Sequence, residues 1–234
     1  MGITLIGLFI IEFLALFLFS RSLSNSLANL FYSITKNRKI TIYILSLIFL
    51  PGTIIHELSH LLTAGLLFVP IDELELLPKF KEENEVQLGS VQVGKTDILR
   101  RTIIGLAPTL IGLAIIFSLL WFFKDGFLGN FSFWQTALIL YAIFEIGNTM
   151  FSSKKDLEGL FVFFLSILII IFIIFITLFI THHIPSFSFL NTLNSKSIVE
   201  FFKKLDLFLL VPIGMDLLIF FLTKFLLNKK HKLS

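Results

Sequence analysis

Long apolar runs dominate the chain, and polar residues gather in the short segments between them. Such runs are candidates for membrane-spanning helices, because roughly 20 apolar residues cross the hydrocarbon core of a bilayer. The sequence predicts six spans, at Ile3–Phe19, Ile40–Val69, Thr102–Phe123, Trp134–Phe151, Leu157–Ile180 and Leu207–Leu227. We therefore expect an all-α, polytopic helical bundle in which residues 1–234 form a single membrane domain.

Residues 70–101, between the second and third predicted spans, form the most polar segment. Within it, residues 86–94 alternate apolar and polar side chains with glycine at intervals, a pattern typical of short strands or a hairpin. We expect a small β element there. It either packs on the bundle as a loop or offers an exposed edge that pairs with an extended peptide.

Composition narrows the class of protein. Hydrophobic residues make up 56% of the chain and charged residues 15%, against about 25% charged residues in soluble domains. This excludes a soluble protein and leaves little chain for a separate soluble domain. The formal charge of +3 comes from Lys and Arg in loops and the tail, so nucleic-acid binding is not indicated. With the N-terminus in the cytoplasm, eleven of these basic residues face inward and eight outward, which favours that orientation.

The second predicted span carries an HExxH sequence. His56 and His60 are four residues apart, so on a helix they share a face and can bind one Zn²⁺, with Glu57 beside them as general base. The chain has no cysteine, so any further ligand must be His, Asp or Glu. Three ionisable groups at membrane depth cost several kcal/mol unless they have partners, which favours a functional role over simple hydrogen bonding across the bundle.

A catalytic zinc normally has three protein ligands, and the third must come from outside the motif. The candidates within or near predicted spans are Glu12, Glu145, Asp156, Glu158, Asp216, His182 and His183. The second and fourth spans run parallel, so Asp156 and the HExxH sequence approach the same membrane face. His182 and His183 follow the fifth span and are expected at the opposite face. For Glu12 and Asp216 we favour interhelical hydrogen bonds, whereas Glu145 is either a partner of the ligands or the third ligand itself.

The spacing of these residues resembles the site-2 protease family of intramembrane zinc metalloproteases. That family combines HExxH with a later segment of Asn, two residues, Pro, four residues and Asp-Gly. Asn148 and Asp156 keep the family's spacing of eight, whereas Phe151 replaces the Pro and Leu157 the Gly. The resemblance covers about residues 40–160, the predicted catalytic core.

The resemblance implies a role for each matching residue. His56, His60 and Asp156 would bind zinc, Glu57 would be the general base, and Asn148 would lie near the substrate backbone or the oxyanion. It also implies that the β segment holds a transmembrane protein substrate in extended form. The expected function is hydrolysis of peptide bonds within or near transmembrane segments.

Two alternatives stay open. One is a membrane HExxH peptidase that uses a Glu as third ligand, and the other is a non-catalytic scaffold or inactive relative. The expected partners are the lipid bilayer and a transmembrane protein, with no nucleic acid. The first apolar run is expected to be a retained anchor rather than a cleaved signal, and we expect a prokaryotic cytoplasmic membrane as the location.

Overall fold

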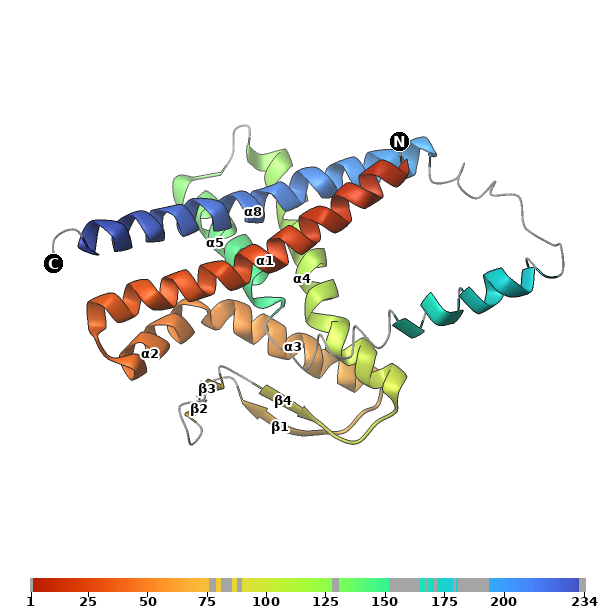
Figure 1. Ribbon diagram of the computed structural model, residues 1–234, viewed down its shortest axis with the longest axis horizontal. Coiled ribbons are helices and arrows are strands. Elements are labelled where there is room, and N and C mark those ends of the chain that lie inside the picture. Colours follow the sequence, from red (N-terminus) through yellow and green to blue (C-terminus); the bar gives the residue numbers. More distant parts are fainter. Residues whose placement is uncertain are drawn as a thin grey trace.

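The apolar runs fold as helices in the computed structural model (Figure 1). The structure describes residues 2–75, 79–80, 86–87, 90–127, 131–151, 165–166, 168–170, 172–178, 180 and 194–231. Its principal helices are α1 (Gly2–Thr35), α2 (Arg38–Ile48), α3 (Leu50–Leu66), α4 (Ile98–Phe127), α5 (Phe133–Thr149) and α8 (Lys196–His231). The described part is mostly helical, as the hydrophobic pattern predicts.

Helix α1 continues well beyond Phe19, where the first apolar run ends. The serines that follow do not stop it, because the Ser20 and Ser24 hydroxyls donate to the carbonyls of Phe17 and Ser20, at 3.1 and 3.0 Å. The Arg21 guanidinium lies 4.7 Å from the centre of the Phe17 ring. The expected end at Phe19 is therefore wrong, since these polar side chains find partners on the helix itself.

The second apolar run is not one straight helix. Helices α2 and α3 meet at Phe49 with a bend of 67°, which makes the pair a broken span or a re-entrant loop. Pro51 lies in the first turn of α3, where its missing N–H is tolerated, whereas in a continuous helix it would remove a hydrogen bond and clash with the preceding turn. The HExxH sequence therefore lies on the shorter helix α3.

Three helices of the described part are long and apolar enough to cross a membrane: Gly2–Thr35, Ile98–Phe122 and Lys196–Lys229. The bent α2–α3 pair makes a fourth if it counts as one span. Helix α5 has 17 residues, fewer than the roughly 20 that a span needs. Of the predicted fifth span, residues 157–164, 167, 171 and 179 lie outside the described residues, and the described remainder is helical. These long apolar helices are compatible with a membrane protein.

The segment between α3 and α4 contains the expected β element, but its pairing differs from a local hairpin. Strand β4 (Ser90–Val93) pairs antiparallel with β1 (Ile71–Glu75), and β3 (Val86–Gln87) pairs with β2 (Lys79–Phe80). Residues 86–87 and 90–93 thus pair with the chain that precedes them. Ile71 and Val93 pack against a small core formed by Ala64, Val69 and Ile104, which joins the β1–β4 sheet to α3 and α4.

Asp97 caps α4 where the chain leaves this sheet. The backbone amide of Arg100 donates to the Asp97 carboxylate at 3.0 Å, and the Arg100 side chain pairs with the same carboxylate at 3.3 Å. The hydrogen bond from the Arg100 amide holds the pKa of Asp97 below its usual value. The start of α4, which lies against α3, is therefore fixed by its own side chains.

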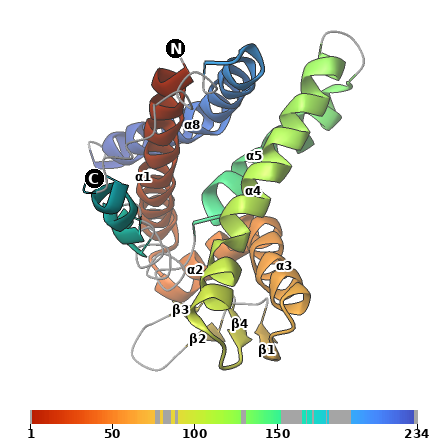
Figure 2. The same ribbon diagram turned by 90° about the vertical axis from the view of Figure 1, so that its right-hand side faces the viewer.

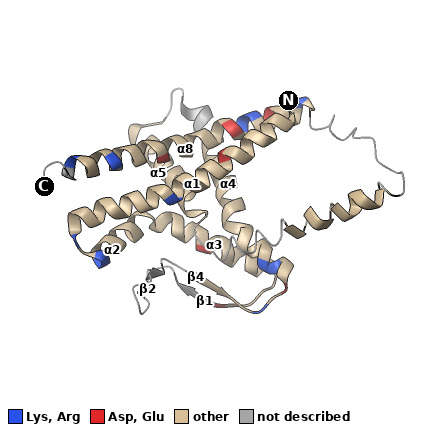
Figure 3. Ribbon diagram, viewed as in Figure 1, with Lys and Arg blue, Asp and Glu red and all other residues tan. Residues whose placement is uncertain are grey.

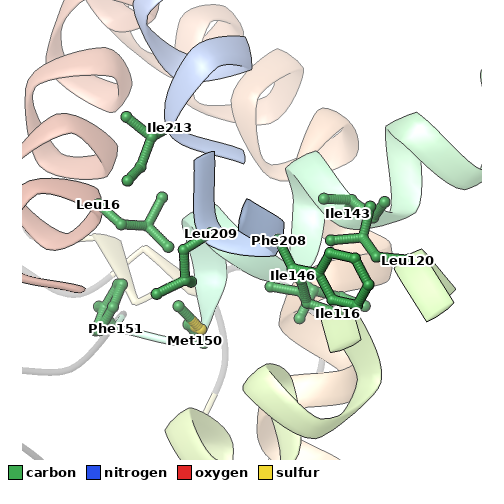
Figure 4. Packing of buried hydrophobic residues seen from close by; sticks show 10 residues of the cluster. All are labelled: Leu16, Ile116, Leu120, Ile143, Ile146, Met150, Phe151, Phe208, Leu209 and Ile213. Carbon is green, nitrogen blue, oxygen red and sulfur yellow. The ribbon is translucent and has the colours of Figure 1, made fainter. Parts of the chain in front are cut away.

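The core lies where α1, α4, α5 and α8 meet (Figures 1 and 2). Helices α1 and α8 run side by side in the same direction: the Gly2 amide donates to Asn194 Oδ1 at 2.9 Å, and the Phe9 and Phe202 rings lie 6.0 Å apart. Figure 4 shows the largest cluster of buried hydrophobic residues: Leu16, Ile116, Leu120, Ile143, Ile146, Met150, Phe151, Phe208, Leu209 and Ile213. Four of these ten come from α5 or the two residues after it, so that part of the chain is the centre of the bundle.

Charge is distributed as expected for a bilayer protein. Figure 3 shows Lys and Arg mainly near helix ends, with long uncharged stretches between them. Five acidic residues nevertheless lie buried inside the described part: Glu12, Glu57, Glu145, Asp206 and Asp216. Ionisable groups within an apolar bundle are rare and commonly functional, so these residues are candidates for a functional site.

Candidate metal centre

The two motif histidines lie together in the interior. His56 and His60 are 3% and 8% exposed, and their Nε2 atoms are 3.2 Å apart. Two nitrogens at zinc–nitrogen distances of 2.0–2.1 Å on one tetrahedral centre are roughly 3.3–3.4 Å apart. The pair therefore has the separation and the chemistry of two ligands of one zinc ion.

A hydrogen bond from α4 orients one of these imidazoles. His60 Nδ1 lies 2.8 Å from the backbone carbonyl oxygen of Ile104. A carbonyl oxygen can only accept, so Nδ1 carries the proton and Nε2 of neutral His60 presents its lone pair toward His56. Ligating histidines in metal sites are typically held by a bond of this kind from the other ring nitrogen.

Glu57 is buried beside the pair, at 6% exposure. Helix geometry places it next to His56 and about one turn before His60. All three motif residues are therefore buried on α3. Among the described residues, no group of three or more His, Cys, Asp or Glu side chains is placed to hold a metal ion.

Asp156, the expected third ligand, lies outside the described residues, as do Glu158, His182 and His183. The structure does show where the chain leading to Asp156 leaves α5. Phe151, which stands where the family has Pro, packs its ring edge-on against Phe13 and Phe17, with ring centres 5.1 and 5.3 Å apart. Thr109 on α4 donates to the Met150 carbonyl at 3.2 Å. The end of α5 is therefore fixed by both α1 and α4.

The same end of α5 lies against α3, close to the histidines. Gly52 is so close to Thr149 that a Cβ on Gly52 would meet Thr149 Oγ1 at 2.5 Å. Gly52 and His56 are four residues apart, which is about 6 Å along a helix. The chain thus leaves α5 about one helical turn from the first histidine.

Asn148 lies buried on α5 with its amide turned to α8. Its Nδ2 donates to the Phe144 carbonyl at 2.9 Å and to Asp216 Oδ1 at 2.7 Å. Asp216 is fully buried, and this interhelical hydrogen bond agrees with the role expected for it. Both N–H groups of the Asn148 amide are occupied in this arrangement.

Glu145, the alternative ligand, is 1% exposed and lies at the first turn of α3. Its Oε2 accepts from the Gly52 amide at 3.4 Å, and its Oε1 has no hydrogen-bond partner in the described part of the chain. One carboxylate oxygen is thus directed to the helix N-terminus, where anions are favoured. Helix α5 therefore contacts the histidine helix through a buried acid.

Sequence reasoning missed two residues. Tyr141 lies one turn before Glu145 on the same face of α5, a spacing visible in the sequence, and its hydroxyl donates to the Ile48 carbonyl at 2.8 Å. Asp206 immediately precedes Leu207, where the last predicted span begins. It is 5% exposed, and neither oxygen of its carboxylate has a hydrogen-bond partner in the described part of the chain.

Comparison with known proteins adds no identification: neither a family model, a curated protein nor a solved structure matches this chain. The assignment therefore depends on the geometry of the motif residues.

Proposed function

We propose that this protein is a zinc-dependent intramembrane endopeptidase of the site-2 protease type. The observation that carries the proposal is the separation of 3.2 Å between the Nε2 atoms of His56 and His60, both buried in an apolar bundle. This separation is close to the one that a tetrahedral zinc ion imposes on two nitrogen ligands, and ionisable side chains inside an apolar bundle are candidates for a functional role. The resemblance in residues 40–160 supports the same class of enzyme.

The proposed ligands are His56, His60 and Asp156. From Phe151, the second residue after α5, five residues of extended chain would reach up to about 17 Å, which would allow Asp156 to approach the histidines. Bound zinc would polarise a peptide carbonyl and lower the pKa of a water molecule to about 7. Glu57 would take the proton from that water and pass it to the leaving amine.

The proposed substrate is a transmembrane segment of another protein. A transmembrane helix hides its carbonyls in internal hydrogen bonds, so it must unwind locally before a peptide bond can be attacked. Strand β4 packs through Val93 near the end of α3, so its edge is well placed to pair with an unwound segment. We further propose six membrane spans and a location in a prokaryotic cytoplasmic membrane.

The first test is the zinc content of the purified protein in detergent. We expect about one zinc per chain in the wild type and in Glu57→Gln, and loss of zinc in His56→Ala and Asp156→Ala. His183→Ala is the matched control, because the predicted topology puts it at the opposite membrane face. No zinc in the wild type after zinc is supplied would refute the proposal.

Activity separates the peptidase from the scaffold alternative. Glu57→Gln should keep zinc and lose cleavage of a transmembrane substrate, because the amide cannot accept a proton from water. A non-catalytic scaffold would keep its function in this variant.

A further inference from the structure

The bend at Phe49 separates two backbone groups that a continuous helix would join. In such a helix the Gly52 amide would donate to the Ile48 carbonyl, four residues earlier. In this structure the Ile48 carbonyl accepts from the Tyr141 hydroxyl at 2.8 Å, and the Gly52 amide donates to Glu145 Oε2 at 3.4 Å. Two side chains of α5 thus bond to the acceptor and the donor of one backbone hydrogen bond that the bend interrupts.

These two side chains belong to one face of α5. Tyr141, Glu145 and Thr149 are spaced four residues apart, so they line up along the helix and follow the bend. At the Thr149 end of this face, Gly52 packs directly on the Thr149 side chain and the Glu145 carbonyl. The Glu145 carboxylate also lies at the N-terminus of α3, where it offsets unpaired amides and the helix dipole.

We propose that Tyr141 and Glu145 are positioning residues for the metal centre, which they serve by fixing the bend that directs α3. This inference rests on the function proposed above. His56 follows Gly52 by one turn, so a shift of the α3 N-terminus moves its imidazole. His60, in contrast, is held from α4 through the Ile104 carbonyl. Helix α3 is therefore held from α5 at its N-terminus and from α4 at His60, and a loose bend would tilt α3 and displace both imidazoles relative to α4 and α5.

The bend can be measured directly, because the chain contains no cysteine. Ile40→Cys and Leu66→Cys place spin labels at exposed positions on either side of it. At 1.5 Å per residue, the helix from Ile40 to the bend at Phe49 is about 13.5 Å long and the helix from Phe49 to Leu66 is about 25.5 Å long. The two labelled positions therefore lie about 33 Å apart across a 67° bend, and they would lie about 39 Å apart in a straight helix.

We expect Tyr141→Phe and Glu145→Ala to lengthen or broaden this distance by up to about 6 Å. Glu145→Gln should stay near the wild type, because its amide oxygen still accepts from the Gly52 amide. Tyr32→Phe, at an exposed position on α1, is the matched control and should have no effect. An unchanged distance in both Tyr141→Phe and Glu145→Ala would overturn the inference.

Metal binding supplies the second readout, with Zn²⁺ affinity and the absorption spectrum of bound Co²⁺ as probes. We expect about tenfold weaker binding in Tyr141→Phe and Glu145→Ala, as for other groups that orient ligands, and near-normal binding in Glu145→Gln. Loss of metal in Glu145→Gln would show that the carboxylate is a ligand and overturn the positioning role. If the wild type binds no metal while the distances still respond, the proposed function fails and the fixed bend stands.

Discussion

Replacement of Gly52 by Ala tests how closely α3 must approach α5. A Cβ at this position would lie 2.5 Å from Thr149 Oγ1, 2.7 Å from the Glu145 carbonyl oxygen and 2.8 Å from Thr149 Cγ2. Ordinary van der Waals contact begins at 3.4 Å. The Thr149 side chain can rotate, but the carbonyl belongs to a packed helix, so the two helices must separate by about 0.7 Å at the crossing.

The expected cost follows from these distances. Overpacking of this kind destabilises by about 1–3 kcal/mol, and Ala recovers about 0.5–1 kcal/mol over Gly inside a helix. We therefore expect Gly52→Ala to lower the free energy of unfolding by about 1 kcal/mol, and by about 2.5 kcal/mol at most. Because His56 is one turn away, the same separation should also weaken zinc binding.

The assay is unfolding in detergent, with zinc affinity measured on the same samples. Gly65→Ala is the control on the same helix, since a Cβ there meets nothing within 4 Å of it in the described structure; it should be neutral or stabilising. Thr149→Ala should rescue Gly52→Ala only in part, because the Glu145 carbonyl remains. A Gly52→Ala protein as stable as Gly65→Ala, with normal zinc affinity, would refute the close crossing.

Three further predictions concern the polar groups of the bundle. Zinc affinity should fall as the pH is lowered from 8 to 5, because protons compete for imidazole nitrogens; a flat titration would contradict imidazole ligation. Asp216→Leu should lower the free energy of unfolding by about 1–3 kcal/mol, because it leaves an Asn148 N–H without an acceptor, whereas Asp216→Asn keeps an acceptor oxygen and should cost less. Equal losses in thermal unfolding would contradict that pairing. Asp206→Asn should raise the unfolding temperature, because both oxygens of the Asp206 carboxylate are buried without a hydrogen-bond partner in the described part of the chain and a neutral amide costs less to bury than a charged group; a lower unfolding temperature would refute this.

The hydrophobic pattern predicts the helical class and the approximate positions of the helices, but not where they bend or end. Pro51 is visible in the sequence, yet a run of apolar residues reads as continuous because hydropathy is insensitive to backbone geometry. The extension of α1 past Phe19 depends on hydrogen bonds from Ser20 and Ser24 to carbonyls of their own helix. Serine makes similar local bonds in turns, so the sequence does not show which structure forms. Strand partners of residues 86–94 depend on tertiary pairing, which alternation alone does not determine.

The candidate site likewise has features that the sequence predicts and contacts that it does not. The helical spacing of His56 and His60 predicts that they share a face, and the structure shows it. Contacts between elements far apart in sequence were not predictable: the Ile104 carbonyl that orients His60 has no side-chain signature. The sequence alone does not distinguish Tyr141 from other tyrosines in apolar helices. Its role depends on the bend at Phe49, which leaves the Ile48 carbonyl available to its hydroxyl.

Asn148 shows how such contacts change the expected chemistry. By resemblance it would lie near the substrate backbone or oxyanion, and stabilising an oxyanion requires an N–H donor. Both of its N–H groups are already committed, to the Phe144 carbonyl and to Asp216, whereas its Oδ1 is buried without a partner in the described part of the chain. The Phe144 carbonyl can only accept, so it fixes the amide in this orientation. If Asn148 contacts a substrate, we therefore expect it to act as an acceptor for a backbone N–H, and in the proposed mechanism polarisation of the peptide carbonyl would depend on a metal bound by His56 and His60.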